Sequence, residues 1–87
     1  MNKFLVIIER GETSYGAYSP DLPGCIAVGQ TMEEVEARML NAMHGHIAHY
    51  LEKGQEIPVP TTAAAFIVAL PISGARAKDN DAKDSAT

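Results

Sequence analysis

The chain has 87 residues, of which 46% are hydrophobic and 21% charged, so it is long enough for one small domain and too apolar for a disordered chain. Residues 1–72 carry the whole net charge of −4, and no cluster of Lys and Arg interrupts them. This distribution argues against nucleic acid as a partner and favours a basic protein.

Three short strands are expected in the first third of the chain. Residues 4–10 form an aliphatic run that ends at Gly11, and residues 14–19 form a second, more polar run, which together predict a hairpin. Residues 25–28 form the third run, which Gly29 ends.

A rigid corner separates the second and third strands. It consists of Pro20, Asp21, Leu22, Pro23 and Gly24. The prolines restrict the unfolded chain and the glycine allows a positive φ, so the corner is suited to holding the two strands in register. A pre-ordered loop can also meet a partner without a cost of ordering, and we keep this second role open.

One long helix is predicted from Met32 to about Lys53. Thr31 and Glu34 form a capping box at its start, and apolar residues then recur at spacings of three and four along one face. Gly54 is expected to close the helix in the left-handed conformation.

A last strand is predicted over residues 63–72 and is strongest over residues 66–70. Pro58 and Pro60 prevent the helix from continuing into it. Residues 73–87 have no apolar side chain larger than alanine, so we expect a domain over residues 1–72 and a disordered polar tail over 73–87.

These elements predict an α+β fold with the order β-β-β-α-β. A right-handed crossover through the helix places the last strand beside the first, which gives a mixed four-stranded sheet of order 3-2-1-4 with the helix on one face. Four strands are about 19 Å wide and a helix only about 10 Å, so one apolar sheet face stays uncovered. A second copy or a different protein must cover it, and we expect a homodimer or higher homo-oligomer.

The motifs of the corner, the helix start and the helix exit together resemble the HicB family, the antitoxins of HicA–HicB toxin–antitoxin pairs. The matching positions are Pro20, Asp21, Leu22, Pro23 and Gly24; Gly29, Thr31 and Glu34; and Ile57, Pro58 and Pro60. The resemblance implies a partial ribonuclease-H-like fold and a non-enzymatic role, in which the protein masks a small basic mRNA-cleaving toxin. Many members add a DNA-binding segment, whereas residues 73–87 lack the pattern for one, so we expect no direct nucleic-acid binding by this chain alone.

The candidate contacts with a partner are Tyr15, Tyr18, Asp21, Leu22, Leu5 and Ile67. Two alternatives stay open: a homo-oligomer without a toxin, and a weak metal or small-ligand site near His46 and His49. Zinc usually takes three or four ligands, and His44 points away from the other two histidines, which disfavours the metal.

Catalysis and cofactors are not expected. A ribonuclease-H-type nuclease needs several carboxylates that converge on metal ions, and the strands and corner offer only Glu9 and Asp21. Cys25 is interpreted as a buried strand cysteine rather than a nucleophile, and as the only cysteine it excludes an internal disulfide. No apolar run is long enough for a signal peptide or a membrane span, which indicates a cytoplasmic protein.

Overall fold

The computed structural model describes residues 2–74. Its elements are β1 (Ile7–Arg10), β2 (Tyr15–Tyr18), β3 (Ile26–Gly29) and α1 (Met32–Glu52), which confirms the α+β class. The first three predicted strands and the helix are present, with ends displaced by up to three residues. The predicted tail lies outside the described residues, apart from positions 73 and 74. Within residues 2–74 no helix has the length and apolar character needed to cross a membrane.

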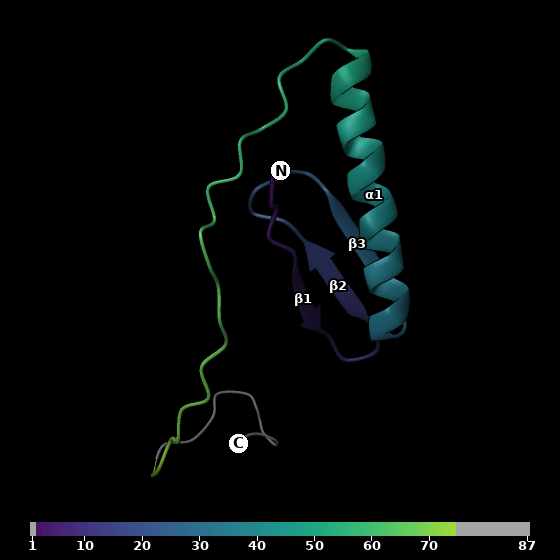
Figure 1. Ribbon diagram of the computed structural model, residues 1–87. Helices are drawn as coiled ribbons and strands as arrows, with labels where there is room; N and C mark the ends of the chain where they lie inside the picture. Colours follow the sequence, from purple (N-terminus) through teal and green to yellow (C-terminus); the bar gives the residue numbers. More distant parts are fainter. Residues whose placement is uncertain (1, 75–87) are drawn as a thin grey trace.

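The sheet has three antiparallel strands in the order β1-β2-β3, with β2 in the centre. Its register aligns Ile8, Ala17 and Ala27 in one row, and these residues contact the core beneath α1. The helix lies along one face and packs on β3 and β2 (Figure 1). Within residues 2–74 no helix covers the other face (Figure 1).

The fourth strand and the sheet order 3-2-1-4 are wrong. Residues 55–73 form neither helix nor strand, and the sheet ends at β1 (Figure 1). The backbone N–H groups of Thr61 and Thr62 bind the Asp21 carboxylate, after which the chain runs extended and Ile67 is 100% exposed. The composition of residues 66–70 suits a strand, but a strand also needs a hydrogen-bonding neighbour, which composition does not specify.

The predicted capping of α1 is confirmed. Thr31 adopts an extended conformation and its Oγ1 accepts the N–H of Glu34 at 3.0 Å, while the Glu34 carboxylate accepts the N–H of Gln30. Arg38 forms an ion pair with Glu34 and donates to the carbonyl oxygen of Val28 at 2.9 Å, which ties the helix to β3. Gly54 has φ +67° after the last turn, as expected for a residue that ends a helix.

Gly29 lies where β3 meets the start of α1. A Cβ atom at this position would lie 2.6 Å from the nitrogen and 2.9 Å from the Cα of Val35, a fully buried core residue. Glycine therefore allows β3 and α1 to pack this closely. Gly45, in the middle of α1, has no atom within 4 Å of the corresponding position.

We predict opposite effects of alanine at these two glycines. Gly29→Ala should lower the free energy of unfolding by about 1–3 kcal/mol, because the backbone atoms of Val35 must move. Gly45→Ala should raise it by about 0.5–1 kcal/mol, because alanine has less conformational freedom to lose in a helix. Urea denaturation of both variants tests the pair. A Gly29→Ala variant as stable as the unmodified chain would contradict the close packing.

Candidate partner-binding surface

The sheet face turned away from α1 carries the apolar side chains of Ile7, Tyr18, Ile26 and Val28, which we call the open face. Ile7, Tyr18 and Ile26 are aligned across the three strands, and Val28 lies two residues along β3 from Ile26. Ile26 is 68%, Val28 55% and Tyr18 38% exposed. Side chains alternate between the faces of a strand, so the neighbours of these residues face the helix.

An acidic residue borders the open face. Glu9 is two residues from Ile7, on the same side of β1, and is aligned across Gly16 with Val28. Glu9 is exposed. The arrangement is an apolar centre with a charged margin, which is the organisation of many protein–protein interfaces.

Asp21 connects three segments of the chain. Its Oδ2 accepts the N–H of Leu5 at 2.9 Å, and its Oδ1 accepts the N–H groups of Thr61 and Thr62 and the hydroxyl of Thr62 at 3.0–3.2 Å. The corner therefore fixes the entry into β1 and the path of the chain after the helix. The first strand begins at Ile7, opposite Tyr18, the last residue of β2, rather than at residue 4 as predicted.

These hydrogen bonds also set the charge state of Asp21. The N–H of Leu5 lowers the pKa of this carboxyl below its ordinary value of 3.8. Burial opposes the shift, and the donors on Thr61 and Thr62 add to it. Donors aimed at a carboxylate stabilise its ionised form. Asp21 is thus a buried anion whose partners are backbone and hydroxyl groups.

The other corner residues also face inward or shape the backbone. Leu22 is fully buried, at 0% exposure, and belongs to the core with Cys25 and Met39. Gly24 has φ +85°, so the predicted positive φ is present, while Pro20 and Pro23 are exposed. In this conformation Pro20 and Pro23 are accessible at the surface, whereas Asp21 and Leu22 are not.

The remaining candidate contacts are spread over the molecule. Tyr18 and Ile67 are exposed, and Leu5 is half-buried. Tyr15 is half-buried against the core. Tyr18 alone among them is part of the open face. Ile26 and Val28 are not among the partner contacts predicted from the sequence, although they alternate with Cys25 and Ala27 along the chain.

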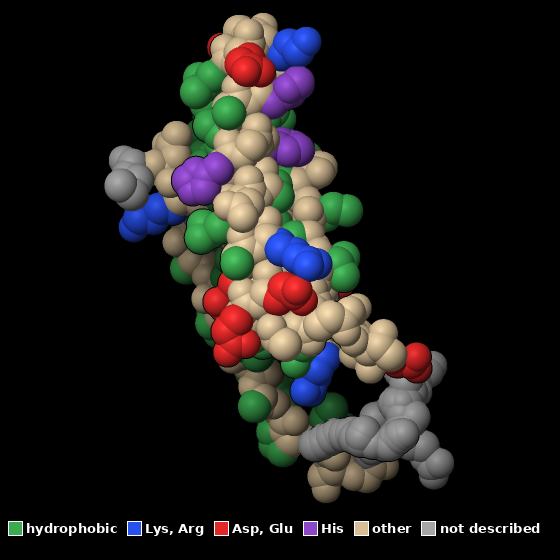
Figure 2. Space-filling model, turned by 90° about the vertical axis from the view of Figure 1, so that its right-hand side faces the viewer, with side chains coloured by type: hydrophobic (Ala, Val, Ile, Leu, Met, Phe, Trp, Pro, Cys, Tyr) green, Lys and Arg blue, Asp and Glu red, His purple; other side chains and the backbone are tan. Residues whose placement is uncertain are grey.

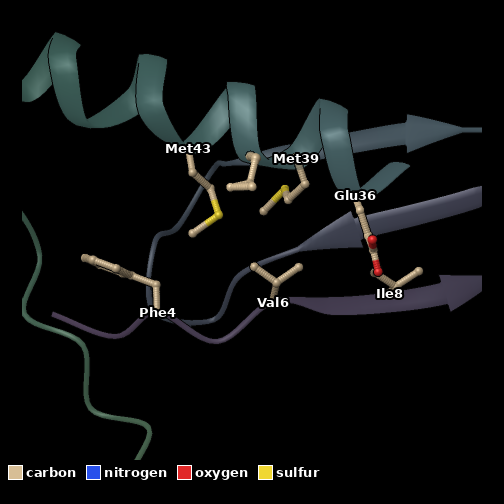
Figure 3. A pocket seen from close by; sticks show the side chains of 7 residues that line it. Phe4, Val6, Ile8, Glu36, Met39 and Met43 are labelled. Carbon is tan, nitrogen blue, oxygen red and sulfur yellow. The ribbon is translucent and has the colours of Figure 1, made fainter. Parts of the chain in front are cut away.

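An apolar groove lies between β1 and α1. It has a volume of 440 Å³ and is lined by Phe4, Val6, Ile8, Glu36, Met39, Leu40 and Met43. Figure 3 shows the side chain of Val6 directed towards those of Met39 and Met43, with Ile8 beside Glu36 and the Phe4 ring turned to one side. The helix packs on β2 and β3, so the space above β1, the edge strand, is left unfilled.

The histidines and the cysteine do not form a reactive centre in the described part of the chain. Residues 2–74 contain no group of three or more His, Cys, Asp or Glu side chains placed to hold a metal ion. Figure 2 shows the histidines spread along the helix, and the His46 ring packs edge-on against Tyr50 with centroids 5.9 Å apart. Cys25 is buried, and burial raises the pKa of its thiol, which disfavours the nucleophilic thiolate.

Comparison with known proteins gives two relatives and one family. Residues 4–75 match the family described as HicB-like antitoxin of bacterial toxin–antitoxin system. The chain is 32% identical over 71 residues to Antitoxin HicB 2 of Photorhabdus laumondii subsp. laumondii, an alignment that covers 82% of this chain and 51% of that protein. It is 34% identical over 62 residues to an uncharacterised 14.9 kDa protein of the rep-hol intergenic region of Haemophilus phage HP1. That alignment covers 71% of this chain and 47% of the phage protein. The chain thus spans about half the length of these curated relatives, and no solved structure matches it.

Proposed function

The chain belongs to the HicB-like antitoxins of bacterial toxin–antitoxin systems, and we propose that it binds a small basic mRNA-cleaving toxin of the HicA type through the open face and masks it. A toxin partner follows from the family. The type of toxin, the surface that binds it and the masking are our proposal.

The observation that carries this proposal is the apolar surface of the open face. Ile26 and Val28, on the edge strand β3, are more than half exposed on a sheet face that the described residues leave uncovered. Each Å² of such surface removed from water contributes about 25 cal/mol. A partner that covers the face would gain this energy, and Tyr18, on the central strand β2, supplies the kind of aromatic contact that often dominates binding.

Charge supports a basic partner. Residues 1–72 carry the whole net charge of −4, and Glu9 borders the open face. Opposite charges on two proteins accelerate their encounter and favour the correct orientation. Of the six candidate contacts, Tyr18 is proposed to touch the toxin and Asp21 and Leu22 to hold the corner beside it.

The proposal requires no catalysis by this chain. Masking occupies the toxin surface stoichiometrically, and a cytoplasmic location would place the complex where mRNA is found. Residues 1–72 are proposed as the toxin-binding domain, with the polar residues 73–87 following it, and DNA binding by this chain alone is not proposed.

A pull-down with the product of the adjacent gene tests the proposal. The double variant Ile26→Asp/Val28→Asp should bind that small basic protein at least about 100-fold more weakly, because two carboxylates would be buried without partners. The control is Leu51→Asp/Val59→Asp, which adds the same charge at exposed aliphatic positions on other surfaces. Equal binding by both double variants, or the capture of no small basic protein, would contradict the proposal.

A homo-oligomer without a toxin is the second candidate function. The unfilled groove and the exposed apolar residues 66–70 favour self-association. This surface is separate from the open face. A chain that self-associates and captures no adjacent-gene product would support this candidate over the first.

A further inference from the structure

Residues 63–72 form an extended apolar segment that we call the arm. Phe66 is 84%, Ile67 100% and Leu70 71% exposed, and the arm contains no charged residue. It does not leave the domain at random, since Asp21 holds Thr61 and Thr62 immediately before it. The same carboxylate holds Leu5, so the arm starts beside the entry into β1.

The domain also has an unused place for an extended segment. β1 pairs only with β2 among the described residues, which leaves the hydrogen-bonding groups on its outer side available. The groove beside this edge is lined almost wholly by apolar side chains, with Glu36 as its one charged residue. An exposed strand edge of this kind readily accepts another strand.

The arm matches the groove in chemistry and spacing. Phe66, Val68 and Leu70 point to one side of an extended segment and span about 13 Å, at about 3.3 Å per residue. Phe4, Val6 and Ile8 repeat at the same interval along the groove wall. An uncharged, extended apolar segment fits this site, whereas a strongly basic surface does not.

The direction of the arm favours a second copy over the same chain. Figure 1 shows that the arm and β1 run in the same direction from the corner. The arm of the same chain could therefore pair with the outer edge of β1 only as a parallel strand. In a dimer whose two-fold axis is perpendicular to β1, the arm of the second copy runs in the opposite direction to β1 of the first copy. That arm would extend the antiparallel ladder of β1, β2 and β3, and antiparallel pairing is slightly more stable per residue.

We propose that two copies of the chain exchange arms, each arm pairing antiparallel with β1 of the other copy and placing Phe66, Val68 and Leu70 in its groove. The contact is reciprocal, so both grooves and both arms are covered at once. Ile67 then lies on the opposite side of the added strand and extends the open face. The exchange does not depend on the toxin.

Sedimentation velocity on the full chain, without a toxin, tests the exchange. The unmodified chain should be a dimer at micromolar concentration. Val68→Asp should weaken the dimer at least about 30-fold, and Leu40→Glu, an exposed groove residue, should do the same. Val59→Asp, which changes an exposed valine before the arm, should leave the dimer intact.

Mixing two monomeric variants distinguishes an exchanged arm from other dimers. Val68→Lys and Leu40→Glu should each be monomeric alone and should form a heterodimer when mixed, because one unmodified arm meets one unmodified groove and the lysine meets the glutamate. Circular dichroism checks that each variant is folded. The proposal would be overturned if the unmodified chain were a monomer. This holds whether its groove is empty, filled by its own arm or occupied only by the product of the adjacent gene. A dimer that survives Val68→Asp would also overturn it.

Discussion

Leu22→Ala is expected to cost about 2–5 kcal/mol of unfolding free energy, the largest loss from a single truncation in this domain. The Leu22 side chain is 0% exposed and lies in the core with Val35 and Met39. Truncation leaves a cavity. The corner cannot move to fill it, because Asp21, the neighbour of Leu22, is held by hydrogen bonds from both Leu5 and Thr61. A domain of this size has little stability in reserve, so much of it would be lost.

Thermal denaturation followed by circular dichroism measures this effect. The melting temperature should fall by roughly 8–40 °C, at about 4–8 °C per kcal/mol for a domain of this length. Leu51→Ala is the matched control, since Leu51 is 65% exposed and its truncation should change stability by about 0.5 kcal/mol or less. Equal effects of the two variants would show that Leu22 is outside the core.

Asp21→Asn is expected to release one of the two segments that the carboxylate holds. An amide replaces one acceptor oxygen with an NH₂ group, so a donor faces either the N–H of Leu5 or those of Thr61 and Thr62. Amide hydrogen exchange should become faster either at Leu5 or at Thr61 and Thr62, and the melting temperature should fall. Glu12→Gln removes the same charge from an exposed loop and should change neither quantity. Unchanged exchange in Asp21→Asn would contradict the connecting role of Asp21.

The pH dependence of stability follows from the same carboxylate. Since the pKa of Asp21 is lower in the folded chain than its ordinary value of 3.8, its contribution is fully present above that value and is lost as pH falls through the folded pKa. Urea denaturation at pH 7 and at progressively lower pH should therefore show a loss below about 3.8 that is smaller in Asp21→Asn. An identical acid dependence in both proteins would contradict the assignment.

The local features of this fold could be predicted from the sequence. Thr31, Glu34 and Gly54 mark the ends of the helix through contacts a few residues away, and Gly24 has the positive φ that its place in the corner required. Such features depend on neighbouring residues, so one sequence contains the information needed.

Pairing between distant segments could not be predicted in the same way. Residues 66–70 have the composition of a strand, but composition does not say which edge accepts it or whether that edge belongs to the same chain. The hydrogen bonds from Thr61 and Thr62 to Asp21 span about 40 residues and had no local pattern. Leu22 is among the partner contacts predicted from the sequence, whereas its side chain completes the core.

The proposal that the open face binds the toxin is tested most directly by methyl NMR spectroscopy. A sample labelled at Ile and Val methyl groups is titrated with the purified product of the adjacent gene. The methyl signals of Ile7, Ile26 and Val28 should shift, while that of Val35, which is 0% exposed, should stay nearly unchanged. Binding that leaves the signals of Ile26 and Val28 in place would contradict the assignment of this surface.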